Sequence, residues 1–129
     1  MAGSFSSSSL VVGDFNAVLG AHECLGSRFL VRGSCEDFKL MIEDYNLIGV
    51  RSLGARFTWV RGHSSYTRVE RRLDMTLVSK GYTLYWHDIS CMALLRWFSN
   101  HCPLWIRISE SRVSSSRPFC FFFFLIKLD

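Results

Sequence analysis

The chain has 129 residues, of which 49% are hydrophobic and 20% charged. This composition fits one globular domain and leaves little room for two. Fifteen Lys and Arg residues against 11 Asp and Glu give a formal net charge of +4, a mild excess that suits an anionic partner without requiring one. The opening MAGSFSSSSL lacks the features of a secretory signal, and the apolar run FCFFFFLI (119–126) is shorter than the about 20 residues of a membrane-spanning helix. We therefore expect no membrane partner.

The cysteines indicate a reducing environment. There are five of them, an odd number, and no two form a C-x-x-C pair. This pattern argues against a disulfide framework or a zinc site and favours buried free thiols. We expect an intracellular location, with the nucleus left open because no targeting signal stands out.

The first half of the chain predicts one strand and one helix. Residues 1–9 are serine-rich and expected to be disordered, and 10–12 (LVV) form a short buried strand that Gly13 ends. A long loop follows over 17–32. Ser34 then opens a helix with acidic residues in its first turn. Its buried stripe is expected to consist of Phe38, Met41, Ile42 and Tyr45, and Asn46 and Gly49 are expected to end it.

The second half predicts mainly strands. Residues 56–60 and 66–75 are expected to form a hairpin around the turn Gly62-His63-Ser64-Ser65. A turn or short helix is predicted over 76–81, and further strands over 89–95 and 103–108. One helix among about five strands indicates an α+β or α/β fold in which the sheet dominates.

Polar side chains follow apolar strands at three places: Asp14 and Asn16, then Asp74, then Asn100 and His101. Each has an ordinary structural interpretation when taken alone. Asp14 ends a strand, Asn16 forms a local turn, Asp74 pairs with a neighbouring arginine on the surface, and a lone histidine beside a turn has no special role.

Taken together, the same residues suit phosphodiester hydrolysis. That reaction needs a base to activate water, a donor to the charged phosphate, and usually a divalent metal held by carboxylates. Asp14 and Asn16 stand two apart, so an extended chain would direct both side chains the same way. A carboxylate such as Asp74 that is hydrogen-bonded to His101 would fix its tautomer and favour its protonated form.

Three ordered segments carry a family resemblance: Gly13-Asp14-Phe15-Asn16, Arg72-Leu73-Asp74, and residues 99–104 (SNHCPL). They resemble the motifs G-D-F-N, R-L-D and S-D-H-x-P-L of the endonuclease/exonuclease/phosphatase family. Phe57-Thr58-Trp59 and Glu23 are similar to the subgroup found in the polyproteins of plant non-LTR (LINE-type) retrotransposons. The segments follow the order of the family across residues 10–108.

The resemblance implies a β-sandwich with helices outside and magnesium-dependent cleavage of DNA or another phosphodiester. It implies that Asp14 orients or deprotonates the attacking water and that Asn16 hydrogen-bonds the scissile phosphate. It further implies that His101 contacts the phosphate, with Asp74 as its supporting carboxylate. The family has an aspartate of the metal site where this chain has Asn100, so we expect magnesium to bind weakly, because a carboxamide lacks the negative charge.

The resemblance covers only the second half of the family fold. We expect residues 10–108 to form a partial domain, about one half of the four-layer sandwich, and residues 109–129 to be a tail without a family counterpart. The asparagine and the metal-binding glutamate of the first half have no equivalent here. An apolar sheet face left uncovered by that missing half is expected to favour self-association.

Four functional hypotheses follow. The first is a truncated, nuclease-related domain with impaired or absent activity. The second is a non-catalytic nucleic-acid-binding module that uses the basic hairpin near Arg68, Arg71 and Arg72. The third is a small phosphatase, against which the missing metal ligands count equally. The fourth is a poorly folding product without a selected role, which is compatible with the first.

Overall fold

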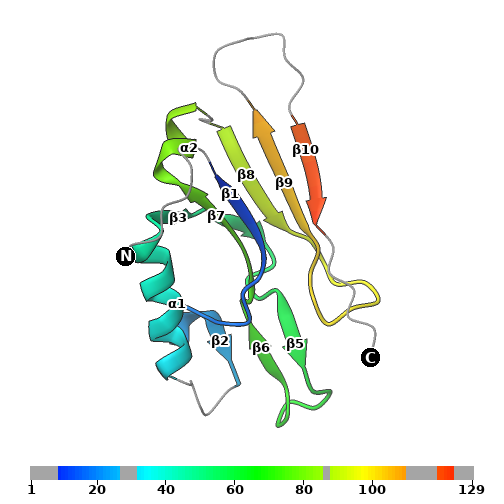
Figure 1. Ribbon diagram of the computed structural model, residues 1–129. Coiled ribbons are helices and arrows are strands. Elements are labelled where there is room, and N and C mark those ends of the chain that lie inside the picture. The colour runs from blue at the N-terminus through cyan, green and yellow to red at the C-terminus, as the bar shows by residue number, and fades with distance from the viewer. Residues whose placement is uncertain (1–8, 27–31, 86–87, 110–118, 124–129) are drawn as a thin grey trace.

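The computed structural model describes residues 9–26, 32–85, 88–109 and 119–123. These residues form a mixed α+β fold in which strands predominate (Figure 1). The helices are α1 (Arg32–Asp44) and the short α2 (Lys80–Tyr85), with a 3-10 turn η1 (Ala21–Glu23). The expected fold class is thus confirmed at the level of α+β.

The first sheet has β7 (Asp74–Ser79) at its centre, between β1 (Leu10–Asp14) and β3 (Leu47–Gly49). Both neighbours run antiparallel to β7. The register pairs Leu10 with Val78 at one end and Asp14 with Asp74 at the other. The sheet therefore brings two carboxylates from distant parts of the chain to the same edge.

Two further sheets complete the fold. The second has the order β10-β9-β8-β4, with β4 parallel to β8 and the other pairs antiparallel. The third is small and antiparallel, with the order β2-β6-β5. Their strands are β4 (Ser52–Gly54), β8 (Asp88–Ala93), β9 (Leu104–Ser109) and β10 (Phe119–Phe123), and β2 (Cys24–Leu25), β5 (Trp59–Arg61) and β6 (Val69–Arg71).

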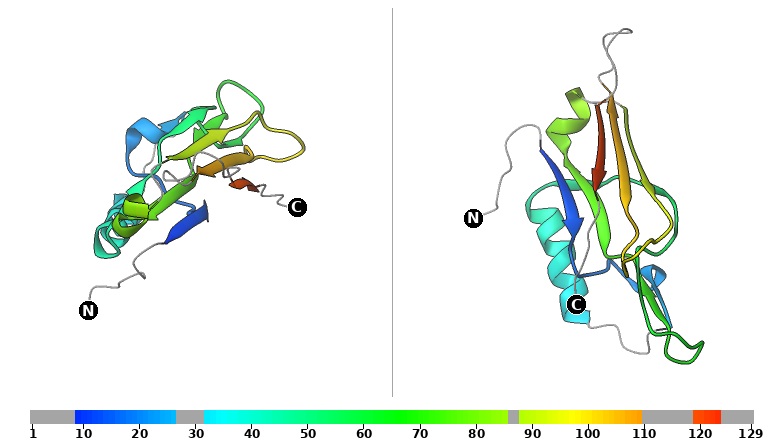
Figure 2. Two further views of the ribbon diagram at one scale, coloured as in Figure 1. Left: turned by 90° about the horizontal axis from the view of Figure 1, so that it is seen from above. Right: turned by 90° about the vertical axis from the view of Figure 1, so that its right-hand side faces the viewer.

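The first sheet lies between α1 and the second sheet, as the side view of Figure 2 shows. Side chains of β7 alternate between these two neighbours because successive residues of a strand point to opposite faces. Met75 and Leu77 pack with Phe38 of α1, whereas Val78 packs with Leu104 and other residues of β8 and β9. All six residues of β7 are buried. The strand that carries Asp74 is thus fixed on both faces.

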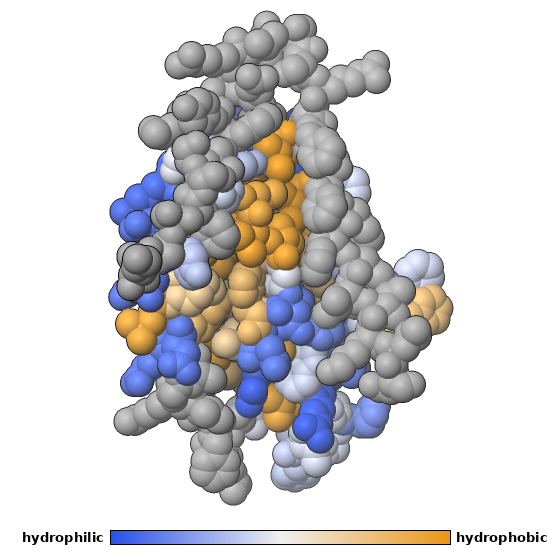
Figure 3. All heavy atoms as spheres, viewed as in Figure 1, coloured by the Kyte–Doolittle hydropathy of each residue, from blue (hydrophilic) through white to orange (hydrophobic). Residues whose placement is uncertain are grey.

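Some apolar side chains remain accessible. Figure 3 shows apolar residues gathered over the centre of the face seen in Figure 1, between β1 and β9. Elsewhere, Leu53, Met92 and Trp105 are neighbours in register across β4, β8 and β9, and each is 44–52% exposed. Self-association through such a surface stays a prediction.

Several expected elements differ from the structure. The helix begins at Arg32, so Ser34 lies within it rather than opening it, and β3 follows it directly. Gly13 lies inside β1 instead of ending it, because its pairing with Met75 continues the ladder to Asp14. The expected buried stripe is confirmed in part: Phe38 is buried, and Met41, Ile42 and Tyr45 pack against the same core.

The second half also needs correction. The hairpin is confirmed, but its strands are β5 and the short β6, and the region predicted as a turn or short helix contains most of β7. The long loop predicted over 17–32 contains η1 and β2. Of the predicted tail, residues 119–123 form β10, which pairs with β9. Ser109 ends β9, and residues 1–8, 110–118 and 124–129 lie outside the described part.

A matched pair of glycines tests the packing of the second sheet. Gly54 has φ +87°, and a Cβ there would lie 2.3 Å from the carbonyl oxygen of Ala93. Gly54→Ala should therefore lower the free energy of unfolding by about 1–3 kcal/mol, measured by urea titration. Gly49→Ala is the control, because its Cβ would meet only Leu77 Cδ2, at 4.0 Å; we expect a change under about 0.5 kcal/mol. Equal effects of the two substitutions would contradict the β4–β8 geometry.

Candidate active site

The site lies at the edge of the first sheet where β1 ends and β7 begins. Asp14 is the last residue of β1 and Asp74 the first of β7, and the two are paired in register. The backbone N–H of Phe15 donates to the carbonyl of Leu73 at 3.0 Å, which extends the ladder past both carboxylates. The separation of these aspartates in space is therefore set by strand pairing.

His101 reaches this edge from the segment before β9. Its backbone forms an isolated antiparallel bridge with Trp59. Its N–H donates to Ser99 Oγ at 3.1 Å, and the next N–H, of Cys102, donates to the carbonyl of Thr58 at 2.7 Å. Trp59 of β5 and the preceding Thr58 thus hold the backbone around His101.

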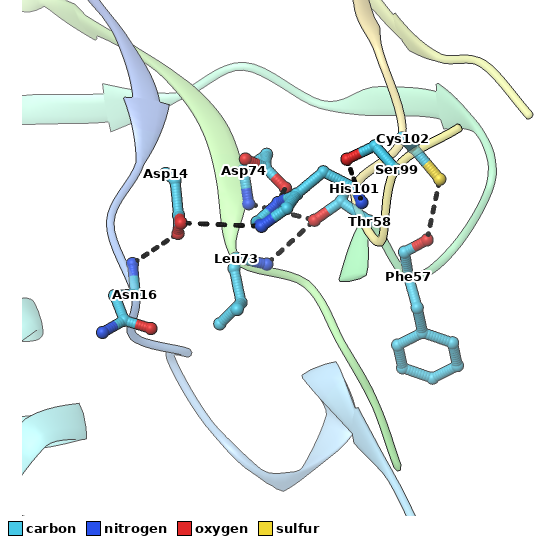
Figure 4. Close-up of polar contacts among 9 residues, drawn as sticks. All are labelled: Asp14, Asn16, Phe57, Thr58, Leu73, Asp74, Ser99, His101 and Cys102. Carbon is cyan, nitrogen blue, oxygen red and sulfur yellow. Dashed lines mark hydrogen bonds and ion pairs between the residues drawn. The ribbon is translucent and has the colours of Figure 1, made fainter. Parts of the chain in front are cut away.

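His101 and Asp74 form a buried side-chain pair. His101 Nδ1 lies 2.8 Å from Asp74 Oδ2, and the residues are 3% and 1% exposed. With Asp74 ionised, this hydrogen bond requires the proton on Nδ1, because a carboxylate only accepts. His101 Nε2 then faces Asp14, whose Oδ2 is 3.8 Å away (Figure 4). Asp74 therefore fixes the orientation and tautomer of the ring that faces Asp14.

Thr58 stabilises the position of the His101–Asp74 pair through backbone hydrogen bonds. Its Oγ1 accepts hydrogen bonds from the backbone N–H groups of Leu73 and Asp74, both at 3.0 Å, and the residue is 1% exposed. These contacts fix the turn that leads into β7 and hence the position of the Asp74 carboxylate (Figure 4). The sequence offered Thr58 only as part of a family-like segment, and its structural role was missed.

Burial raises the pKa of the Asp74 carboxyl group, because an ionised carboxylate loses solvation in the interior. The hydrogen bond to His101 and the nearby Thr58 hydroxyl oppose this rise, and the charge of Asp14 adds to it. Asp74 Oδ1 is buried, and among the described residues it has no hydrogen-bond partner. The expectation that Asp74 pairs with an arginine on the surface is therefore wrong: it lies in the interior and pairs with His101.

Asn16 does not join the cluster in the way the spacing predicted. β1 ends at Asp14, and Asn16 has φ 51°, in the left-handed region that asparagine tolerates better than most residues. Its N–H donates to Asp14 Oδ1 at 2.8 Å, and its side chain points away from the Asp14 carboxylate and His101 (Figure 4). The two side chains diverge because the chain turns. This turn also fixes one oxygen of Asp14, leaving the other directed at His101.

Asp14, Asp74 and His101 form a group that could hold a metal ion, because one donor atom of each lies within 4.8 Å of the others. The donor set contains two carboxylates and an imidazole. Mg²⁺ prefers six oxygen ligands, whereas imidazole suits transition metals such as zinc. The group therefore fits a divalent cation in general and offers magnesium few ligands.

Asn100, the expected metal-site position, is exposed. Its carbonyl accepts a hydrogen bond from the N–H of Val60 at 3.1 Å, and the residue lines a neighbouring pocket together with three arginines. Glu23 is buried and accepts the N–H of Leu19 at 2.7 Å, so its carboxylate supports the loop after β1. Three of the five residues predicted from the sequence thus meet directly.

Comparisons of the chain with protein-family models, with curated proteins and with solved structures found no match. No helix in the described ranges has the length and apolar character that crossing a membrane requires.

Thr58→Val should destabilise the site. Valine keeps the shape but leaves two buried N–H donors without an acceptor, at a cost of about 1–3 kcal/mol for each. We expect a fall of at least about 2 kcal/mol in the free energy of unfolding, measured by urea titration. Thr58→Ser retains the hydroxyl and should lose less than half as much. A Val variant as stable as the Ser variant would contradict the role of Oγ1.

The raised pKa of Asp74 makes stability depend on pH. A folded-state pKa above the unfolded value means that the native state binds the proton more tightly. This contribution is complete below the unfolded value, about 3.9, and is lost as pH rises through the folded pKa. The unaltered chain should therefore lose stability relative to Asp74→Asn across this window, in urea titrations at a series of pH values. A difference in stability between the two proteins that does not change with pH, or that changes in the opposite direction, would contradict a raised pKa of Asp74.

Proposed function

We propose that residues 10–108 form a partial domain of the endonuclease/exonuclease/phosphatase type that retains an impaired centre for phosphodiester hydrolysis. The observation that carries this proposal is the buried hydrogen bond of 2.8 Å between His101 Nδ1 and Asp74 Oδ2, with Asp14 Oδ2 3.8 Å from Nε2. The motif resemblance implies that these three residues act together. Their convergence from three separate segments supports it.

The roles follow from exposure and orientation. The side chain of Asp14 is 25% exposed and is the accessible carboxylate of the cluster, so it is the group that can orient or deprotonate a water molecule. His101, held by Asp74, presents Nε2 to the same space and, when protonated, donates to a phosphate oxygen. Asp74 is a positioning residue, because its carboxylate contacts His101 and lies in the interior. Asn16 is exposed beside Asp14 and would contact substrate only after its side chain turns.

Magnesium is the cation that the resemblance implies, and the accessible carboxylate of Asp14 would hold it, with His101 beside it and Asp74 positioning His101. A bound divalent cation would polarise a phosphoryl oxygen and lower the pKa of its water. Few oxygen donors gather here, and Asn100 stands at the position of a family carboxylate. Weak cation binding and weak or absent cleavage are the consequences that we propose.

The first test is nicking of supercoiled plasmid DNA by the purified chain. In Mg²⁺ we expect slow conversion to the open circle at most. EDTA or His101→Ala should abolish whatever conversion occurs, because loss of a positioned acid–base group typically costs about 10²–10⁴-fold. Robust nicking that His101→Ala abolishes would overturn the impairment, and nicking that survives this substitution would overturn the site.

The second test restores the missing charge. Asn100→Asp should raise the affinity for Mg²⁺ measured by isothermal titration calorimetry, because it adds an anionic oxygen ligand next to His101. Asn100→Gln is the matched control, since it alters the side chain without adding charge. An unchanged affinity in Asn100→Asp would count against position 100 as part of the cation site.

A further inference from the structure

A second polar feature lies beside the candidate active site. It is a pocket of about 280 Å³ between the β5–β6 hairpin and the segment that precedes β9. Backbone hydrogen bonds fasten the two walls together, from Val60 to Asn100 and from Cys102 to Thr58. The lining residues are Val60, Arg61, Gly62, His63, Arg68, Arg96 and Asn100. We call this the arginine pocket.

The arginine pocket is positively charged. Its lining, as far as the structure describes the chain, includes three arginines and one histidine and no acidic residue. Arg68 pairs with Glu70 at 2.8 Å, but within the described ranges no carboxylate lies within 4.0 Å of Arg61 or Arg96. Two guanidinium groups that make no ion pair among the described residues are suited to bind an anion. Their planar forks match the oxygen atoms of a phosphate group.

The size of the pocket limits its ligand. A volume of about 280 Å³ lies below the about 300–1,000 Å³ of pockets that enclose drug-sized ligands. A phosphate group with some of its water fits this space, whereas a whole nucleotide would extend outside it. Whatever is attached to the phosphate would therefore extend beyond the pocket.

The segment that carries Arg96 also carries exposed aromatic rings. Trp97 and Phe98, which follow Arg96 directly, are 70% and 86% exposed. Their ring centroids are 4.8 Å apart, and Phe98 has φ 56°, an uncommon conformation for a bulky residue. The loop that carries them projects from the end of the β8–β9 hairpin (Figure 1). Exposed aromatic residues on the same segment as a basic residue are typical of proteins that stack unpaired bases.

We propose that the arginine pocket binds a backbone phosphate of a single-stranded nucleic acid and that the adjacent bases stack on Trp97 and Phe98. A single strand fits better than a duplex because its bases offer free faces. The inference is independent of hydrolysis at the Asp14 cluster. The sequence placed the basic site near Arg68, Arg71 and Arg72. We place it instead at Arg61 and Arg96, because Arg68 forms an ion pair with Glu70.

The test is fluorescence anisotropy of a labelled oligodeoxythymidylate titrated with the full chain at low salt in EDTA. Arg61→Ala and Arg96→Ala should each weaken binding about tenfold, as expected for loss of a charge-assisted contact. Each should also lower the slope of log K against log salt by about 0.7. Arg51→Ala, an exposed arginine outside the pocket, is the matched control and should bind like the unaltered chain. Equal losses of affinity in all three arginine variants, or no binding by the unaltered chain, would overturn the proposal.

Substitutions of Trp97 test the proposed stacking of bases. Trp97→Leu should weaken binding about tenfold and Trp97→Phe much less, because phenylalanine keeps a ring to stack on. A duplex of equal length should bind at least about tenfold more weakly than the single strand. Equal affinity for both forms would overturn the single-strand assignment. Displacement of the oligonucleotide by inorganic phosphate at an equal concentration would show a small-anion site instead. EDTA excludes cation-dependent cleavage, so these outcomes are read separately from the nicking assay.

Discussion

The buried hydrogen bond between His101 and Asp74 joins the central strand of the first sheet to the segment that leads into β9, beside the apolar core that the two sheets share. The two residues are 27 positions apart, and one belongs to the central strand of the first sheet while the other precedes β9 of the second. Removing one partner of a buried pair typically costs about 3–5 kcal/mol, because the other is left uncompensated. Placing these residues in the interior therefore requires support around them, and the third sheet supplies much of it.

Thr58 carries most of that support. Its N–H donates to the carbonyl of Arg71, its carbonyl accepts from Cys102, and its hydroxyl accepts from Leu73 and Asp74. One buried residue thus links the hairpin, the start of β7 and the segment that carries His101. The small third sheet has few core residues of its own, so its position depends on these backbone contacts. The same set of hydrogen bonds therefore fixes the geometry of the site and attaches the third sheet to the rest of the fold.

The sequence predicted the convergence of Asp14, Asp74 and His101 because each follows or precedes an apolar strand within a recognisable motif. It failed on β7 because that strand is buried on both faces, so the alternation that marks a half-exposed strand is absent. Two polar residues of β7 are buried with hydrogen-bond partners. Thr76 bonds to Cys91, and Ser79 accepts from the N–H groups of Ser9 and Tyr82. The sequence also failed on Asn16, because spacing along the chain does not reveal where a strand ends. Local turns and contacts between distant segments decide these points.

Asn100 lies between the proposed cation site and the proposed anion site, which have opposite electrostatic requirements. It precedes His101 of the acidic cluster, and it lines the arginine pocket with Arg61 and Arg96. A carboxylate at this position would add an anionic ligand for a cation, but it would also neutralise part of the charge that attracts a phosphate. The carboxamide has the opposite effect on both. If both proposals hold, the same side chain links them: the Asn100 carboxamide would weaken cation binding at the acidic cluster while leaving the arginine pocket positive for an anionic strand.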